Sequence, residues 1–134
     1  KEKAMKLASK HGVDIDYDIC SIADFYADEE SYDCIALTYV HIPEEVRKNF
    51  HGKLIKLLSP GGTLILEGFN KNQIENTSGG PKDISMLFSI DELKSDFKDL
   101  IISKLVEEDT ALKEGEFHKG KASVIRLVAS KASN

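Results

Sequence analysis

The most constraining feature of the sequence is an apolar strand, an amphipathic helix and a second apolar strand that follow one another between residues 32 and 68. Residues 34–40 (CIALTYV) form an unbroken apolar run of strand length, and residues 63–66 (TLIL) form a second one. Such continuous runs are typical of parallel strands that are covered on both faces. The spacing therefore predicts an α/β sheet with helices packed against it.

The helix between these strands begins at Pro43, because proline is well tolerated at the first helical position. It ends before Pro60-Gly61-Gly62, which turns the chain. One apolar stripe is expected to face the sheet, made of Val46, Phe50, Leu54, Leu57 and Leu58.

On the N-terminal side of this unit, residues 3–11 have helical spacing, and Gly12 ends that helix. Residues 13–20 alternate strictly between apolar side chains and the aspartates at positions 14, 16 and 18. This period of two predicts a strand with one exposed face. The stretch 23–31 is polar and acidic, which favours a loop that contains at most one helical turn.

On the C-terminal side, the polar stretch 70–86 is long enough to suggest a functional or disordered loop. Ser89 and Glu92 form a capping box that predicts a helix. Strands are expected at 101–106 and 122–129, joined by a charged connection, and they should be antiparallel neighbours.

Composition restricts the class of protein. With 134 residues, 41% of them hydrophobic and 31% charged, the chain is expected to form a single domain, 1–134. A net charge of −5 argues against nucleic acid as a partner, and no apolar run is long enough to span a membrane. Cys20 and Cys34 lie among apolar residues, so we expect them to be reduced and buried, as in a cytoplasmic protein.

Several local sequences resemble class I S-adenosylmethionine-dependent methyltransferases, and in particular their small tellurite-resistance-type subgroup. They are Tyr32-Asp33-Cys34-Ile35-Ala36, His41-Ile42-Pro43, the run from Leu58 to Leu66, Gly79-Gly80-Pro81-Lys82 and Ser89-Ile90-Asp91-Glu92-Leu93. The resemblance implies a Rossmann-like methyltransferase sheet, mostly parallel with a C-terminal antiparallel strand, in the family order 3-2-1-4-5-7-6. It also implies S-adenosylmethionine as cofactor.

The glycine-rich G-x-G-x-G loop of that family has no counterpart in residues 1–134. The chain therefore resembles the C-terminal two-thirds of the family domain, with the N-terminal strands missing, and we expect upstream residues to complete it. By itself the chain should bind S-adenosylmethionine weakly or not at all. The sheet edge left by the missing strands suggests self-association.

The resemblance also implies site residues. Ser21 and Ile22 would approach the cofactor's adenine, and Thr38 and Tyr39 its methionine part. The alternatives are a simple turn for the first pair and a role in the core for the second. Glu67 and His118 would bind substrate. The alternative for Glu67 is a solvated or ion-paired carboxylate, and the alternative for His118 is a solvated side chain. The histidines and cysteines lack the spacing of metal ligands.

His41 follows an apolar strand and precedes the helix that begins at Pro43. Histidine titrates near neutral pH and is therefore a candidate catalytic base. A cap for the following helix is an equally good interpretation.

Three functions fit these observations. The first is methyl transfer from S-adenosylmethionine to a small-molecule acceptor. The second is a non-catalytic, methyltransferase-like interaction module that lacks the cofactor half. The third is a nucleotide- or nicotinamide-binding α/β domain, for which the missing glycine loop is also a difficulty.

Overall fold

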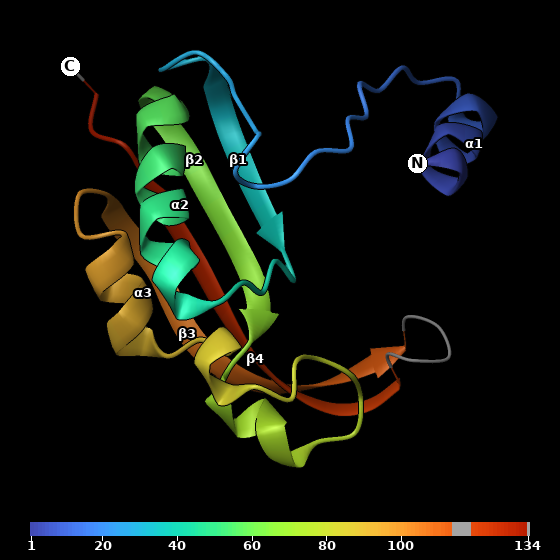
Figure 1. The fold of residues 1–134 in the computed structure, drawn as a ribbon, viewed down its shortest axis with the longest axis vertical. Coiled ribbons are helices and arrows are strands. Elements are labelled where there is room, and N and C mark those ends of the chain that lie inside the picture. The colour runs from blue at the N-terminus through green and yellow to red at the C-terminus, as the bar shows by residue number, and fades with distance from the viewer. Residues whose placement is uncertain (114–118, 134) are drawn as a thin grey trace.

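The computed structural model describes residues 1–113 and 119–133. Figure 1 shows three helices and four strands in chain order. Their bounds are α1 (Glu2–His11), β1 (Tyr32–Thr38), α2 (Glu44–Leu57), β2 (Leu58–Phe69), α3 (Ile90–Asp96), β3 (Ile101–Lys113) and β4 (Lys119–Ser130). Two short 3-10 helices, Lys71–Glu75 and Ile84–Met86, lie between β2 and α3. Within the described ranges, no helix is both long and apolar enough to cross a membrane.

The four strands form one sheet in the order β1-β2-β4-β3. β1 and β2 are parallel, whereas β4 is antiparallel to both of its neighbours. Three described strands therefore share one direction and only β4 opposes them. This confirms the expected α/β sheet, mostly parallel with one antiparallel strand, and the strand order corresponds to the 4-5-7-6 part of the expected family order.

The helix α2 begins after Pro43 and ends at Leu57, as the sequence predicts, but its buried face differs from the predicted stripe. Leu54 and Leu57 are buried in the core, whereas Val46 is 42% exposed. Arg47 and His51 take its place on the buried face. The stripe was drawn from apolar residues alone, and it missed two polar side chains that are buried because they pair with Asp96 of α3.

The predicted capping box is confirmed at the start of α3. The Ser89 hydroxyl accepts a hydrogen bond from the Glu92 N–H at 3.4 Å and donates one to the Glu92 carboxylate at 2.7 Å. This cap satisfies one of the free N–H groups of the first turn. Leu93 and Phe97 are thereby directed into the core, where both are fully buried.

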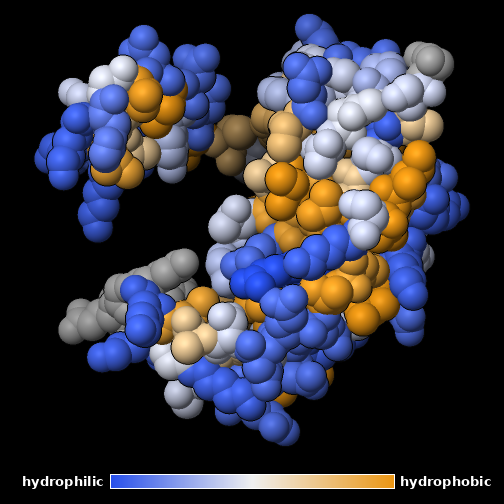
Figure 2. Space-filling model, turned by 180° about the vertical axis from the view of Figure 1, so that it is seen from behind, coloured by the Kyte–Doolittle hydropathy of each residue, from blue (hydrophilic) through white to orange (hydrophobic). Residues whose placement is uncertain are grey.

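Only one face of the sheet is covered along β1 and the middle of β2. In Figure 1, α2 and α3 lie on the same side of the sheet, and the main apolar core fills the space between them and the strands. On the opposite face Cys34 and Ala36 are exposed, and Ile65 is 43% exposed. Figure 2 shows hydrophobic side chains gathered on that face. For the described residues, the expectation that both strands are covered on both faces is therefore wrong.

The N-terminal helix is confirmed as α1, but the strand predicted at 13–20 is absent. These residues are extended and exposed, and no described strand pairs with them. Strand periodicity alone is insufficient, because a strand is held by hydrogen bonds to a neighbour. Cys20 and Cys34 are both free and exposed, which contradicts their predicted burial.

The closing strands are confirmed as antiparallel neighbours, but they are longer than predicted. Residues 107–113 and 119–121, assigned to a charged connection, extend β3 and β4 into a hairpin that projects past the sheet (Figure 1). Their charged side chains are compatible with strands there because much of the hairpin faces solvent.

The polar stretch 70–86 is ordered by buried hydrogen bonds. The Gln73 amide accepts from the Ser123 N–H at 2.8 Å and donates to the Ser78 hydroxyl at 3.0 Å. Ser78 in turn donates to the Lys121 carbonyl at 2.6 Å. These bonds tie the stretch to β4.

Candidate functional site

The carboxyl ends of β1 and β2 lie side by side, because the two strands are parallel and pair Thr38 with Glu67. Ligands of open α/β sheets bind beyond such strand ends. Three predicted residues, Thr38, Tyr39 and Glu67, and the candidate base His41 meet here. We call these four residues the rim.

Tyr39 holds an unusual backbone conformation at the rim. Its φ of 53° lies in the left-handed region, which non-glycine residues seldom adopt. Two hydrogen bonds to Glu67 hold it there: the Tyr39 N–H donates to the Glu67 carbonyl at 2.7 Å, and its hydroxyl donates to the Glu67 carboxylate at 2.9 Å. Strained residues of this kind cluster at functional sites.

One residue that the sequence analysis did not select, Arg126, also binds Glu67 and links it to Glu108. Arg126 of β4 donates to the Glu67 carboxylate at 2.6 Å and to Glu108 of β3 at 2.5 Å. Partial burial raises the pKa of Glu67, but the hydrogen bonds from Arg126 and Tyr39 outweigh it and lower the pKa overall. The group is therefore ionised at neutral pH. A lone arginine within the apolar run 122–129 was the available sequence signal.

Both ring nitrogens of His41 are engaged within the chain. Its Nε2 accepts a hydrogen bond from the Phe69 N–H at 3.0 Å, and its Nδ1 lies 2.8 Å from the Met86 carbonyl. Because a carbonyl can only accept, Nδ1 carries the proton and the ring is neutral. Burial lowers the pKa of His41, and the bond to Met86 offsets this only in part.

Close packing fixes the His41 ring between Phe69 and Phe88, at centroid distances of 5.5 and 4.9 Å. Gly68 permits this approach, since a Cβ there would lie 2.7 Å from the Phe88 ring and 3.3 Å from the His41 ring. The capping alternative is wrong: no side chain caps α2 at Pro43. To act as a base, Nε2 would first have to lose its hydrogen bond from the Phe69 N–H. The geometry therefore favours a structural role, in which His41 holds the Phe69 and Met86 backbone in place. The catalytic role stays a prediction.

The other three predicted site residues do not belong to the rim. Ser21 and Ile22 form no hydrogen bond with it in the described structure, and His118 is not among the described residues. Ser21 sits in an exposed turn, where its hydroxyl donates to Asp24 at 2.6 Å and accepts from the Asp24 N–H. Ile22, beside it, is half-buried. In the described part of the chain, no group of three or more histidine, cysteine or acidic side chains is placed to hold a metal ion.

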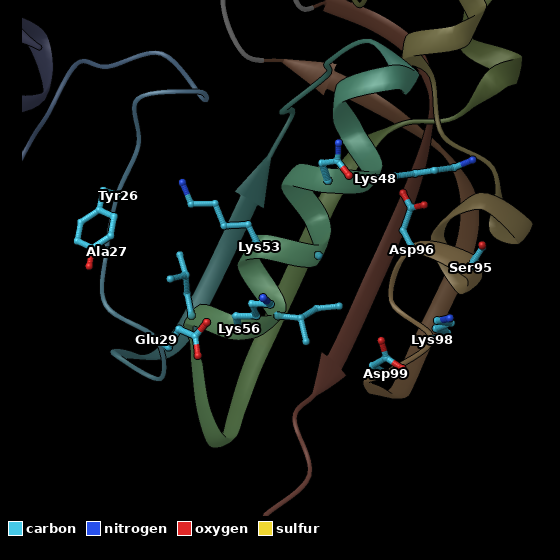
Figure 3. A pocket seen from close by; sticks show the side chains of 14 residues that line it. Tyr26, Ala27, Glu29, Lys48, Lys53, Lys56, Ser95, Asp96, Lys98 and Asp99 are labelled. Atoms are coloured by element: carbon cyan, nitrogen blue, oxygen red, sulfur yellow. The ribbon is translucent and has the colours of Figure 1, made fainter.

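A groove of about 840 Å³ lies elsewhere on the molecule. It runs between α2, the end of α3 and residues 26–29, as Figure 3 shows, and none of the six predicted site residues that the structure describes lines it.

Comparisons with solved structures identify the fold. An S-adenosylmethionine-dependent methyltransferase from Methanosarcina mazei matches all of this chain and 80% of its own length, with a TM-score of 0.70 and 14% identity. TehB from Haemophilus influenzae matches 95% of this chain and 44% of its own, with a TM-score of 0.71 and 19% identity. The chain has the class I methyltransferase fold.

A protein named as a cyclase has a similar fold. The cyclase SpnF matches 98% of this chain and 62% of its own, with a TM-score of 0.67 and 11% identity. This chain therefore spans less than two-thirds of the length of TehB and of SpnF. No protein-family model matches the sequence, and no curated protein matches it either. At these identities the comparisons establish architecture, and chemistry must be argued from the site.

Proposed function

We propose that this protein transfers the methyl group of S-adenosylmethionine to a small-molecule acceptor. The observation that carries the proposal is the rim. The strand order of the methyltransferase fold brings a strained Tyr39, an ionised Glu67 and an exposed Thr38 to adjacent carboxyl ends. These groups lie where ligands of this architecture bind.

The described residues fit only one side of a cofactor site. In this proposal Thr38 and Tyr39 would contact the methionine part through the backbone. The Ser21 hydroxyl is engaged by Asp24, and residues 1–134 contain no G-x-G-x-G loop that would let the backbone approach the ligand closely. S-adenosylmethionine, when bound, supplies an electrophilic methyl group, so the protein has mainly to align donor and acceptor.

Within this proposal the chain's own residues orient the acceptor. Tyr39 and Arg126 fix the Glu67 carboxylate from two directions. Glu67, Arg126 and Glu108 together carry one net negative charge. That surface suits an acceptor that donates hydrogen bonds or carries positive charge.

The test uses the protein expressed from its complete coding sequence. S-adenosylhomocysteine release is measured with small amines, thiols and oxyanions, and in parallel with RNA and DNA. We expect turnover with at least one small molecule and none with nucleic acid. Tight, salt-sensitive binding of RNA or DNA would contradict the acceptor class.

A second candidate is the interaction module, favoured by the exposed edge and face of β1. β1 ends the described sheet, and Cys34 and Ala36 on it are exposed. Pairing two copies antiparallel through this edge places no like charges opposite each other, because Asp33 is the only charged residue in β1. A dimer whose population rises with concentration would support this self-association. Oxidation should link its two copies through a Cys34 disulfide, and Cys34→Ser should prevent this covalent link. A strictly monomeric chain would oppose it.

A further inference from the structure

The groove shown in Figure 3 has a volume of about 840 Å³. This lies within the range of roughly 300–1,000 Å³ typical of small-molecule sites. Its floor is formed by α2 and includes Ile55 and Leu57, and residues 26–29 and 95–99 form the sides. It is separate from the rim, so a ligand here would be additional to the proposed methyl transfer.

Four lysines line the groove, although the whole chain carries a net charge of −5. They are Lys48, Lys53, Lys56 and Lys98. In the described structure, Lys56 and Lys98 form neither an ion pair nor a side-chain hydrogen bond. Lys48 lies 3.5 Å from the exposed Glu44, and Lys53 donates to the Phe25 carbonyl. At least two ammonium groups are therefore available to a ligand.

Three acidic residues also line the groove, and they do not cancel this charge. Asp96 is engaged by Arg47 at 2.8 Å, with both side chains only 1% exposed. Glu29 and Asp99 remain against the four lysines. The solvent-facing lining is thus positive overall.

Gly52 provides independent evidence that the groove is kept open. It lies within α2, four residues from both Lys48 and Lys56, so the three share one face of the helix. A Cβ at Gly52 would meet nothing within 4 Å, and its φ is not one that requires glycine. Glycine inside a helix is destabilising relative to alanine. The space above α2 between the two lysines is therefore open.

The wall of the groove carries an aromatic ring. Tyr26 is 80% exposed, and its hydroxyl donates to Asp28 at 3.2 Å. An exposed ring beside ammonium groups offers a stacking surface to a flat ligand. Asn49 and Ser95 add groups that can donate hydrogen bonds within the same lining.

We propose that this groove binds a small anion that carries phosphate groups. Lys56 and Lys98 pair with the phosphate oxygens, Gly52 leaves room for them above α2, and Tyr26 contacts any aromatic ring attached to them. The proposal does not depend on methyl transfer.

Calorimetric titration of the 134-residue chain with sodium tripolyphosphate and with ATP tests it. We expect saturable binding that weakens as salt rises. Tighter binding of ATP, lost in Tyr26→Ser, supports a phosphorylated aromatic ligand; equal binding supports recognition of the phosphates alone. No saturable binding of either probe would overturn the proposal.

Variants separate the groove from general charge effects. Lys56→Glu and Lys98→Glu should each weaken binding by about tenfold or more. Lys3→Glu on α1 makes the same change in net charge and should leave binding unaltered. Equal weakening by all three would contradict a defined site.

A final variant fills the groove. Gly52→Leu should abolish binding without lowering the melting temperature, because leucine is the better helix former. Unchanged affinity in this variant would show that the ligand does not lie above Gly52, and would overturn the proposed site.

Discussion

The two faces of the sheet hold their charged residues in different ways. On the helix-covered face, Arg47 of α2 and Asp96 of α3 form an ion pair at 2.8 Å with both side chains almost fully buried. On the opposite face, Arg126 and Glu67 pair at 2.6 Å with both side chains 34% exposed. Similar distances thus occur in very different surroundings. Burial, rather than distance, decides what each pair contributes, because water screens the exposed pair and cannot replace a lost partner in the buried one.

The buried pair is also tied to a histidine. The His51 Nδ1 lies 2.9 Å from the same Asp96 oxygen that Arg47 contacts. Burial raises the pKa of Asp96, but the hydrogen bonds from His51 and Arg47 outweigh it and lower the pKa. The stabilisation from this carboxylate is therefore present above its unfolded pKa of about 3.9 and is lost as pH falls through the lower folded value.

Removing the buried charge should have the largest effect. Asp96→Asn removes the buried carboxylate and leaves the buried Arg47 with only Glu92, at 3.6 Å, as an ion-pair partner in the described structure, so we expect unfolding to become about 3–5 kcal/mol easier. Urea denaturation measures this. Glu44→Gln, which breaks the exposed pair with Lys48, is the control and should cost about 0.5 kcal/mol or less. A small loss in Asp96→Asn would mean that water reaches the pair.

Neighbouring residues of β2 compare the two faces directly. Leu64 is fully buried under the helices, and Leu64→Ala should cost about 2–5 kcal/mol. Ile65 points to the open face at 43% exposure, and Ile65→Ala should cost about 1 kcal/mol or less. The same denaturation measurement applies. Equal losses would show that something covers the open face in solution.

His41 should make stability sensitive to mild acid. Its folded pKa is lowered by burial, so the neutral ring stabilises the fold above the unfolded pKa of about 6.5, and this is lost as pH falls towards the folded pKa. His41→Ala leaves the Met86 carbonyl and the Phe69 N–H without their hydrogen bonds to the ring. It should lower the free energy of unfolding by about 1–3 kcal/mol at pH 8. The difference from the native chain should shrink at lower pH. His11→Ala, at an exposed position on α1, is the control and should change the free energy of unfolding by about 0.5 kcal/mol or less.

Turnover of the His41→Ala variant distinguishes a structural role of His41 from a catalytic one. If His41 is the base, His41→Ala should lower turnover per folded molecule of the complete protein by about 10²–10⁴-fold. Unchanged turnover together with a lowered melting temperature would refute the catalytic role.

The exposed pair should give the smallest effect. A double-mutant cycle with Glu67→Gln and Arg126→Gln should yield a coupling of about 0.2–1 kcal/mol. The coupling should fall as ionic strength rises, since the pair is partly open to water. A large coupling energy that does not fall as salt rises would mean that water is excluded from the Glu67–Arg126 pair as it is from the Arg47–Asp96 pair. The two faces would then not differ in how they hold charge.

Much of the fold was predictable because it depends on local chemistry. Pro43, the capping box of Ser89 and Glu92, and the apolar runs of β1 and β2 each specify structure through neighbouring residues alone. The segment 13–20 has an equally strong pattern and still forms no strand. Its period of two describes which side chains share a face, but the hydrogen bonds of a strand come from elsewhere in the chain.

The candidate site was predictable only in part. Tyr39 and Glu67 could be placed at strand ends, because a parallel sheet puts its carboxyl ends together. Their partner Arg126 lies 59 positions beyond Glu67, and only the register of β2 against β4 brings the two together. Three of the groove lysines belong to α2, whereas Lys98 follows the end of α3, so they could not be grouped in advance.

By itself, then, the sequence determined the order of helices and strands from β1 onward, the α/β class and the strand ends where a site would form, since these follow from periodicity, capping and chain direction. It did not determine the full lengths of β3 and β4. Tertiary structure decided which charges are buried, which face of the sheet stays open, and that His41 braces Phe69 and Met86. Those outcomes depend on pairings between residues far apart in the chain, and the free energy of each pairing depends on how much water the finished fold excludes.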